Sequence, residues 1–272
     1  TATLALPNGR SAASVSVGYE FSCALLDDGK IACWGLSQRV GGSTGQLSQR
    51  VTTPTLVNDI NFQNRSAVAL DVGHNHACAI LEDGGIVCWG SNDYGQLGDG
   101  TTISRTTPIN VTNLSQMHKP VAISAGTIRT CIITQIGTVV CWGNNVYGQL
   151  GTGNTSTILS PQHSSAVNLP HPAVGISSGN YQTCALLTNG YVWCWGSNSL
   201  GQLGDGSTTS STVPVNVTGI PANRTVTSIS SGGSHTCATL DNASVMCWGG
   251  NSAGVLGDGT LQNRNSATMI DY

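Results

Sequence analysis

Hydrophobic and polar residues along this chain form short alternating runs or short continuous apolar runs, and nowhere a helical period. Between residues 173 and 226, VGISSG (174–179) and TVPVNV (212–217) alternate, whereas QTCALL (182–187) and YVWCWG (191–196) are almost continuously apolar. The turn-rich stretch SNSLGQLGDGSTTSS separates the third run from the fourth. Pro214 suits the end or the edge of a strand. This order predicts four short antiparallel strands.

The same order of runs recurs five times along the chain. Each copy contains a Cys-Trp-Gly triplet followed by a tail of the Gly-Gln-Leu-Gly type, with the triplets starting at Cys33, Cys88, Cys141, Cys194 and Cys247. The repeats lie at 13–60, 67–114, 120–168, 173–220 and 226–270. Such units predict a single all-β domain, a β-propeller of five four-stranded blades.

The two ends of the chain match segments inside it. PNGRSAASVSVG (7–18) matches PANRTVTSISSG (221–232), and SATMIDY (266–272) matches TTPINVTN (106–113). The chain therefore begins in the middle of a repeat, and we expect residues 1–11 to complete the last blade and close the ring. The alternative is an open array whose terminal edges pair with another copy, because unpaired edges recruit strands.

All ten cysteines belong to the repeat, two in each copy and ten residues apart. A turn signal such as DDG (27–29) or TNG (188–190) lies midway between them, so each pair faces across a hairpin. Zinc ligands usually come in closer pairs, and buried free thiols are the remaining alternative. The spacing predicts five disulfides, which persist in oxidising compartments: Cys23–Cys33, Cys78–Cys88, Cys131–Cys141, Cys184–Cys194 and Cys237–Cys247.

The recurring pattern G-x4-C-A-L, a turn, a strand ending in C-W-G, then N-x2-G-Q-L-G-D-G-T and a later P-x-x-V resembles the repeat of the regulator of chromosome condensation family. The resemblance covers essentially the whole chain and implies a β-propeller. The founding member of that family is a nuclear exchange factor for a small GTPase, without this cysteine set, and the best-known members have seven blades. The sequence is more similar to secreted, cysteine-containing relatives, so the resemblance implies the fold and not the exchange activity.

Composition narrows the expected partners. Charged residues make up 8% of the chain, and the net charge is −3. Ten scattered cations form no basic patch, so no nucleic-acid partner is expected, because phosphate binding needs clustered Lys and Arg. No apolar run approaches the roughly 18 residues of a membrane span.

Most candidate chemistry falls on shared repeat positions, which usually serve folding. The aspartates of the GDG turns are Asp99, Asp205 and Asp258, and the position two before the first cysteine holds Phe21, His76, Arg129, Gln182 and His235. His74 and His76 lack a third metal ligand nearby, so structural roles are favoured. No nucleophile elbow, H-E-x-x-H or phosphate-binding loop occurs. We expect no catalytic residue, no metal site and no cofactor.

Two further groups of residues concern surface chemistry. Seven asparagines begin an N-x-S/T sequon and are predicted N-glycosylation sites: Asn64, Asn110, Asn113, Asn154, Asn216, Asn223 and Asn242. Departures from the repeat are candidates for partner binding, with tolerated surface as the alternative. They are Trp193, Tyr19, Tyr94, Tyr147 and Tyr181, together with the inserts 36–45, 113–120 and 164–172.

These observations predict a non-enzymatic extracellular or cell-surface protein. Its first predicted role is a structural or adhesive module, or a subunit of a surface filament, with a protein, a glycan or further copies of itself as partner. The alternative is a secreted inhibitor or receptor ectodomain that binds a protein or glycan through a propeller face. GTPase exchange is least expected, because it requires a reducing cytosol.

Overall fold

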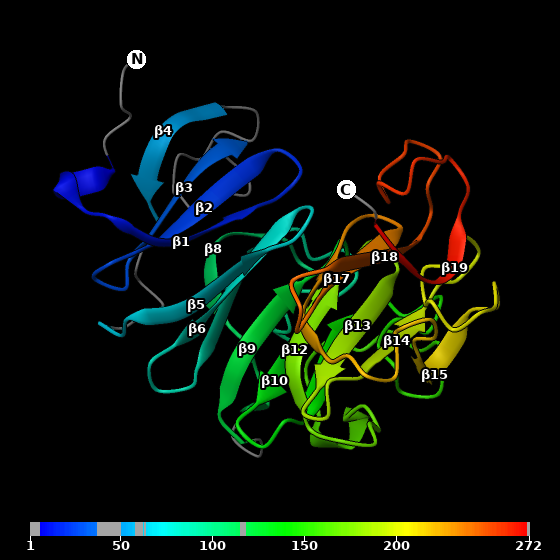
Figure 1. Ribbon diagram of the computed structural model, residues 1–272. Helices are drawn as coiled ribbons and strands as arrows, with labels where there is room; N and C mark the ends of the chain where they lie inside the picture. The colour runs from blue at the N-terminus through cyan, green and yellow to red at the C-terminus, as the bar shows by residue number, and fades with distance from the viewer. Residues whose placement is uncertain (1–5, 37–49, 58–61, 63, 115–117, 271–272) are drawn as a thin grey trace.

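The computed structural model describes residues 6–36, 50–57, 62, 64–114 and 118–270. They form five antiparallel sheets arranged as successive blades (Figure 1). The bounds are β1 (Ala12–Val17), β2 (Phe21–Leu26), β3 (Ile31–Leu36), β4 (Arg50–Leu56); β5 (Ala67–Val72), β6 (His76–Leu81), β7 (Ile86–Gly90), β8 (Arg105–Asn110); β9 (Pro120–Ala125), β10 (Arg129–Thr134), β11 (Val139–Gly143); β12 (Ala173–Ser178), β13 (Gln182–Leu187), β14 (Val192–Gly196), β15 (Ser211–Asn216); β16 (Val226–Ser231), β17 (His235–Leu240), β18 (Val245–Gly249), β19 (Arg264–Met269). Two short 3-10 helices are η1 (Pro7–Gly9) and η4 (His163–Ser165).

Every blade is built around one disulfide-bonded hairpin. In the fourth blade β13 pairs with β14 so that Cys184 lies opposite Cys194, with a Cα–Cα distance of 4.1 Å. The turn closes because Gly190 takes a φ of +79°, a left-handed conformation that glycine adopts without strain. Corresponding pairs join the hairpins of the other four blades, so the five predicted disulfides are confirmed.

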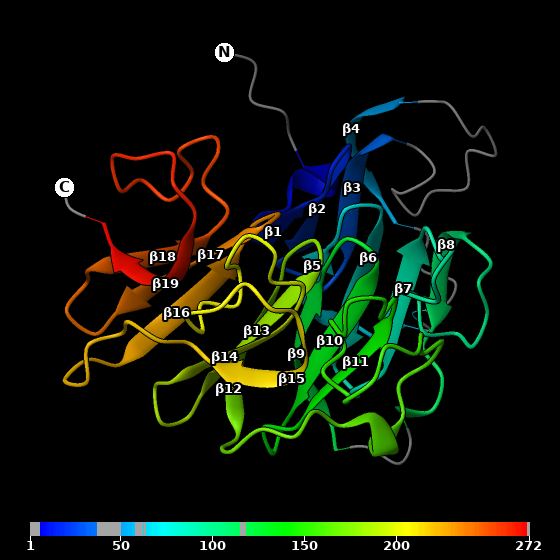
Figure 2. The same ribbon diagram turned by 90° about the vertical axis from the view of Figure 1, so that its right-hand side faces the viewer.

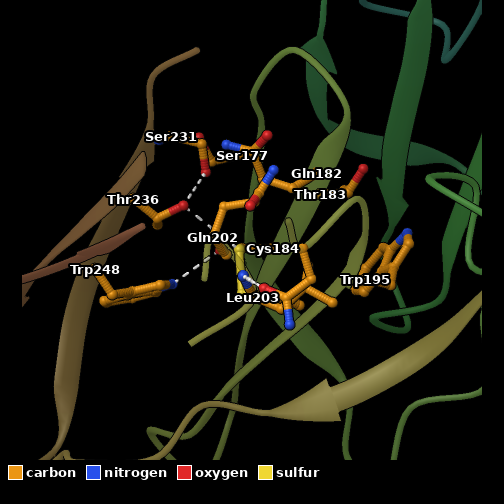
Figure 3. The surroundings of a disulfide bond; sticks show 12 residues. Ser177, Gln182, Thr183, Cys184, Trp195, Gln202, Leu203, Ser231, Thr236 and Trp248 are labelled. Atoms are coloured by element: carbon orange, nitrogen blue, oxygen red, sulfur yellow. Dashed lines mark hydrogen bonds between the residues drawn. A yellow bond between two sulfur atoms is a disulfide. The ribbon is translucent and has the colours of Figure 1, made fainter. Parts of the chain in front are cut away.

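Neighbouring blades are joined by a buried tryptophan and the tail of the preceding blade. Trp248 is fully buried, and its indole N–H donates to the carbonyl oxygen of Gln202 at 3.1 Å (Figure 3). Gly204 is required there, because a Cβ would lie 2.8 Å from the indole nitrogen. Trp142 and Trp195 make the same bond to Gln96 and Gln149. The repeat tail of one blade therefore binds the tryptophan of the next blade and connects the two blades.

The third blade departs from the others in its outer strand. The sheet of β9, β10 and β11 has three strands, whereas the other four sheets have four. Two isolated bridges, Val140↔Ala166 and Gly143↔Ile158, take the place of its fourth strand. The prediction of five blades with one disulfide each is confirmed, and the segment around η4 forms the outer edge of this blade.

The blades follow one another in an arc, with both termini on the side where the first and last blades lie (Figures 1 and 2). A glycine follows each inner strand, and each of the first four of these glycines lies close to the corresponding glycine of the next blade around the axis. Their order is Gly18, Gly73, Gly126, Gly179, Gly232. The contacts found around Gly232 do not include Gly18, so closure of the ring stays a prediction.

The segment before the first blade is described only from residue 6 onward. Leu6 packs beside Trp34 and Leu56 of the first blade. The prediction that residues 1–11 complete the last blade is untested, because residues 1–5 lie outside the described part of the chain.

Candidate functional site

The candidate site is the mouth of the propeller axis, formed where the five inner strands end. A cavity of about 250 Å³ opens there and is lined by residues of all five blades. Around it, the position after each axial glycine holds a different residue in each blade: Tyr19, His74, Thr127, Asn180 and Gly233. We call these five residues the axial ring. Both the axial ring and the position after it differ in every blade, whereas the position before it is glycine in all five, so the blades differ from one another at this mouth.

Contacts between blades fix the axial ring. The Tyr19 ring stacks on the His74 ring with centroids 4.4 Å apart and planes inclined by 10°. Thr127 Oγ1 donates a hydrogen bond to Asn180 Oδ1 at 2.8 Å. The backbone N–H of Asn180 donates to the backbone carbonyl oxygen of Gly233 at 2.9 Å. Tyr19 is 69% exposed and Asn180 is half-buried, and these contacts between blades hold both side chains in place at the mouth.

A layer of buried polar side chains lies beneath the axial ring, at the position two before the first cysteine. Arg129 is fully buried, and its Nε donates to Thr183 Oγ1 at 2.8 Å, while its terminal nitrogens donate to the carbonyl oxygens of Asn180 and Gln182. Burial lowers the pKa of Arg129 to about 9. All these partners are neutral, so a buried cation sits below the mouth and fixes Asn180 from underneath.

His76 occupies the same position in the second blade. Its Nε2 lies 2.9 Å from Thr130 Oγ1, and its Nδ1 is buried without a hydrogen bond among the described residues. Burial, and secondarily the charge of Arg129, lowers the pKa of His76 to about 3. A neutral imidazole beside a cationic guanidinium supports the frame and provides no base near a nucleophile. His235 is half-buried, and burial also lowers its pKa.

Asp71 is a carboxylate at an inner-strand position where other blades carry a serine, such as Ser16 and Ser177. Asp71 accepts hydrogen bonds from Ser16 Oγ at 2.8 Å and from the Ala125 amide at 2.7 Å, which join three blades. Burial raises its pKa. The equivalent serine Ser177 accepts from the Ser231 amide at 2.8 Å (Figure 3). Asp71 therefore holds the inner strands of three blades together and is not an accessible catalytic acid.

The aspartates of the GDG turns hold their loops, as expected from their repeated position. Asp99 accepts from the Asn92 amide at 3.1 Å and from Thr101, and pairs with Arg105 at 3.2 Å. Asp258 pairs with Arg264 at 2.6 Å. Within the described ranges there is no cluster of three His, Cys, Asp or Glu side chains that could hold a metal ion. His74 and His76 have separate partners and do not converge.

The other residues singled out in the sequence lie apart from the axial ring. Tyr147 and Tyr181 meet edge to face at 5.1 Å between the third and fourth blades, and Tyr94 is 44% exposed on the second. Trp193 is half-buried on β14. The insert 36–45 lies almost wholly outside the described residues, and 113–120 does so in part.

All seven sequon asparagines are exposed, and glycosylation stays a prediction. Asn113 differs from the rest because its side-chain amide donates to Ser160 Oγ at 3.0 Å.

Sequence reasoning found Tyr19 and His74 but not Thr127, Asn180 or Gly233. The available signal was the position directly after an unchanged glycine, which, like the position that follows it, holds a different residue in every copy. Which face of the propeller that position occupies follows only from the packing of the blades.

The comparisons with known proteins agree with the architecture. The family model described as RCC1-like domain matches residues 2–271. The ultraviolet-B receptor UVR8 of Arabidopsis thaliana is 30% identical over 94% of this chain and 57% of its own length. The structure of Prp20p from Saccharomyces cerevisiae, a protein with binding properties toward Gsp1p and histones, superposes with a TM-score of 0.83 at 20% identity, over 97% of this chain and 64% of that one.

A third similar structure is the entire ectodomain of the receptor kinase CR4 from Physcomitrella patens. It superposes with a TM-score of 0.57 at 23% identity, over 89% of this chain and 52% of that one. At these identities the solved structures share the fold alone. The chain spans less than two thirds of the length of the curated relatives it matches. No helix in the described ranges is both long and apolar enough to cross a membrane.

Proposed function

The chain belongs to the RCC1-like domain family, and from that premise we propose that it is a non-catalytic, extracellular propeller that binds a protein through the axial mouth. The observation that carries the proposal is the axial ring: five different residues at one repeat position, exposed or half-buried on one face and held by contacts between blades. Varied groups on a rigid frame are typical of partner-binding sites.

Three features support the extracellular, non-catalytic part of the proposal. Five disulfides persist where the medium oxidises. The fold also occurs in a receptor ectodomain. In the described residues, the buried titratable groups Asp71, His76 and Arg129 are bonded within the frame and do not converge on one reacting point. On this proposal the exposed sequon asparagines carry glycans, and no exchange activity on a GTPase is expected.

A binding comparison tests the axial mouth. Immobilised wild-type protein is compared with a variant in which Tyr19, His74 and Asn180 are all replaced by glycine, the residue of the fifth blade at this position. The control is Tyr94→Ser, which removes an exposed aromatic ring from the rim. We expect one stoichiometric protein partner to be retained by the wild type and the control and lost by the triple variant. Retention of the same partner by all three proteins would contradict the axial mouth as the binding face.

The extracellular part is tested separately by thiol labelling of unreduced, denatured native material. No reactive thiol is expected. Ten reactive thiols would remove the argument for an oxidising compartment.

A second candidate, end-to-end assembly, is favoured by the two ends of the arc. Trp34 of the first blade is only partly buried and makes no hydrogen bond among the described residues, unlike Trp142, Trp195 and Trp248. Gly257 in the tail of the fifth blade contacts Ile270 and no tryptophan. On this proposal, Trp34 of one copy packs on the tail around Gly257 of another copy, as Trp248 packs on the tail around Gly204. Electron microscopy over a range of concentrations tests the idea, and single discrete particles throughout would contradict it.

A further inference from the structure

A second cavity, of about 510 Å³, lies between the third and fourth blades and shares no lining residue with the axial mouth. Its walls include Thr152, Asn168, Leu169 and Pro170 from the third blade and Trp193 and Pro214 from the fourth. Pockets of about 300–1,000 Å³ hold ligands in proteins. The cavity is therefore large enough for a specific ligand and is independent of the site proposed above.

The walls of this cavity are formed where the chain departs from its own repeat. The third blade lacks a regular outer strand, and its outer edge is bridged at Ile158 and at Ala166, which lies in the segment 164–172. Thr152 stands where three other blades have the GDG aspartate, at Asp99, Asp205 and Asp258. Trp193 stands where the other blades have smaller apolar residues, Ala32, Val87, Val140 and Met246. Repeat folding does not require these residues, because four other blades form without them.

Polar groups in the cavity lack partners. Thr152 Oγ1 is buried and makes no hydrogen bond among the described residues. The Trp193 indole N–H finds no acceptor in the described part of the chain either, and the Asn168 side chain is exposed. Buried polar groups are normally hydrogen-bonded, so the unpaired Thr152 hydroxyl in the wall of the cavity becomes a donor to a ligand when its side chain rotates toward the cavity.

The cavity is formed in advance by backbone bonds. The Gly153 amide donates to the carbonyl oxygen of Thr212 at 2.9 Å, which ties the third-blade loop to β15. The Val167 amide donates to the carbonyl oxygen of Val139 at 2.9 Å, which ties the insert to β11. A ligand would therefore enter a rigid site at little cost in conformational entropy.

We propose that this cavity binds a short, uncharged, proline-rich segment of a partner protein in the polyproline II conformation, with Trp193 as the anchor. No charged side chain lines the cavity, so a charged ligand gains no partner there. Polyproline II presents apolar rings and carbonyl oxygens that make no internal hydrogen bond, and aromatic-lined grooves recognise it. The indole, Pro170 and Pro214 match the rings, and the Trp193 N–H, the Thr152 hydroxyl and the Asn168 amide match the carbonyl oxygens. A glycan would require more hydrogen-bonding side chains than Thr152 and Asn168 supply.

The test uses the whole protein labelled with 5-fluorotryptophan and observed by fluorine NMR. The probe is an acetylated and amidated proline decapeptide, titrated against a neutral oligosaccharide, cellohexaose, in a parallel series. The Trp193 resonance is assigned by its loss in Trp193→Val. We expect it to shift saturably with the peptide, while the resonances of the fully buried Trp142, Trp195 and Trp248 stay in place.

Two variants and a control complete the test. Trp193→Val introduces the residue that the second and third blades carry at this position, and it should weaken peptide binding about tenfold or more, followed by calorimetry. Thr152→Val removes only the hydroxyl and should weaken it severalfold, and it retains the fluorinated Trp193 as reporter. Tyr94→Ser should leave binding unchanged. Absence of a saturable shift, equal affinity in Trp193→Val, or a Trp193 shift with the oligosaccharide instead of the peptide would overturn the proposal. None of these outcomes depends on the axial mouth.

Discussion

The third and fourth blades carry the same hairpin and the same tail, and they differ at the turn that follows the tail. In the fourth blade the Asp205 carboxylate accepts a hydrogen bond from the side-chain amide of Asn198 at 3.1 Å and another from the backbone amide of Ser207 at 2.9 Å. The regular strand β15 follows this turn. In the third blade Thr152 stands in that place and makes no such bond.

In both blades the side-chain amide of the asparagine before the turn also donates hydrogen bonds to backbone carbonyl oxygens of the loop. Asn145 in the third blade donates to the carbonyl oxygens of Asn154 and Ser156, just as Asn198 donates to those of Ser207 and Thr209 in the fourth. The loop of the third blade is therefore held by fewer bonds, and its outer edge is built from two isolated bridges. The change from carboxylate to hydroxyl at Thr152 thus accompanies the lost strand and the cavity, together with the segment 164–172 and Trp193.

The same two blades also differ in the buried layer below the axial ring, where Arg129 of the third blade aligns with Gln182 of the fourth. Gln182 Nε2 donates to the carbonyl oxygen of Gly232 at 3.2 Å, and Arg129 donates to the corresponding part of the next blade. In both blades the side chain at this repeat position donates a hydrogen bond to a backbone carbonyl oxygen of the next blade. The side chain is charged in the third blade and neutral in the fourth.

The largest expected effect is shared by the two blades. Replacing Cys184 and Cys194 together by alanine should lower the free energy of unfolding by about 3 kcal/mol, because the disulfide restricts the unfolded chain. Replacing Cys131 and Cys141 should cost about the same, because the two hairpins have the same length. Urea denaturation measures both losses. A much smaller loss in the third blade would show that the difference between the blades extends into the hairpin.

The next effect converts the fourth blade toward the third. Asp205→Thr removes an acceptor of the buried Asn198 amide and should lower the free energy of unfolding by about 1–2 kcal/mol. Hydrogen exchange should rise in β15 beyond the change elsewhere. Asp241→Thr, an exposed aspartate in a hairpin turn, is the matched control and should have little effect. Unchanged exchange in β15 would separate the turn carboxylate from the outer strand.

The reverse change should have a smaller effect of the opposite sign. Thr152→Asp supplies the missing acceptor for Asn145 and should raise the free energy of unfolding by about 0.5–1 kcal/mol. Thermal denaturation measures the gain, with Thr152→Val as the control that adds no acceptor. A loss of stability in Thr152→Asp would mean that the third-blade loop cannot take the conformation of the fourth.

The last effect concerns the buried layer, and its size depends on the pH at which stability is measured. The pKa of His76 is lowered to about 3 in the folded state, whereas an unfolded histidine titrates near about 6.5. Below about pH 6.5 the unfolded chain therefore binds a proton that the folded chain does not. Stability should fall as the pH decreases from about 6.5 toward 3, by at most about 1.4 kcal/mol per pH unit from this group.

Arg129→Gln, which introduces the residue of the fourth blade, removes a like charge beside His76 and should raise the pKa of His76 and reduce this loss. Burial remains the first cause of the low pKa, so the change is modest. NMR titration of the His76 ring measures it, and His76→Gln should abolish this part of the pH dependence. An unchanged pKa of His76 in Arg129→Gln would show that burial alone sets it.

The sequence predicted features that depend on neighbours along the chain. The alternation of strands, the turn glycine at 190 and the spacing of Cys184 and Cys194 all act within one hairpin, so the blade and its disulfide could be predicted. The structural role of Asp99, Asp205 and Asp258 followed from their shared position in a turn. Five copies of one such unit also determined the number of blades.

Tertiary structure alone decided which residues from different repeats meet. Tyr19 stacks on His74, and Thr127 bonds to Asn180, across more than fifty residues of chain. The burial of the Arg129 cation and the cavity beside Trp193 likewise depend on how one blade packs on the next. The reason is physical: the sequence period sets each blade, whereas the angle and depth at which blades pack arise from side chains of two repeats at once. That packing placed a variable repeat position on one face and formed a cavity beside an irregular outer edge.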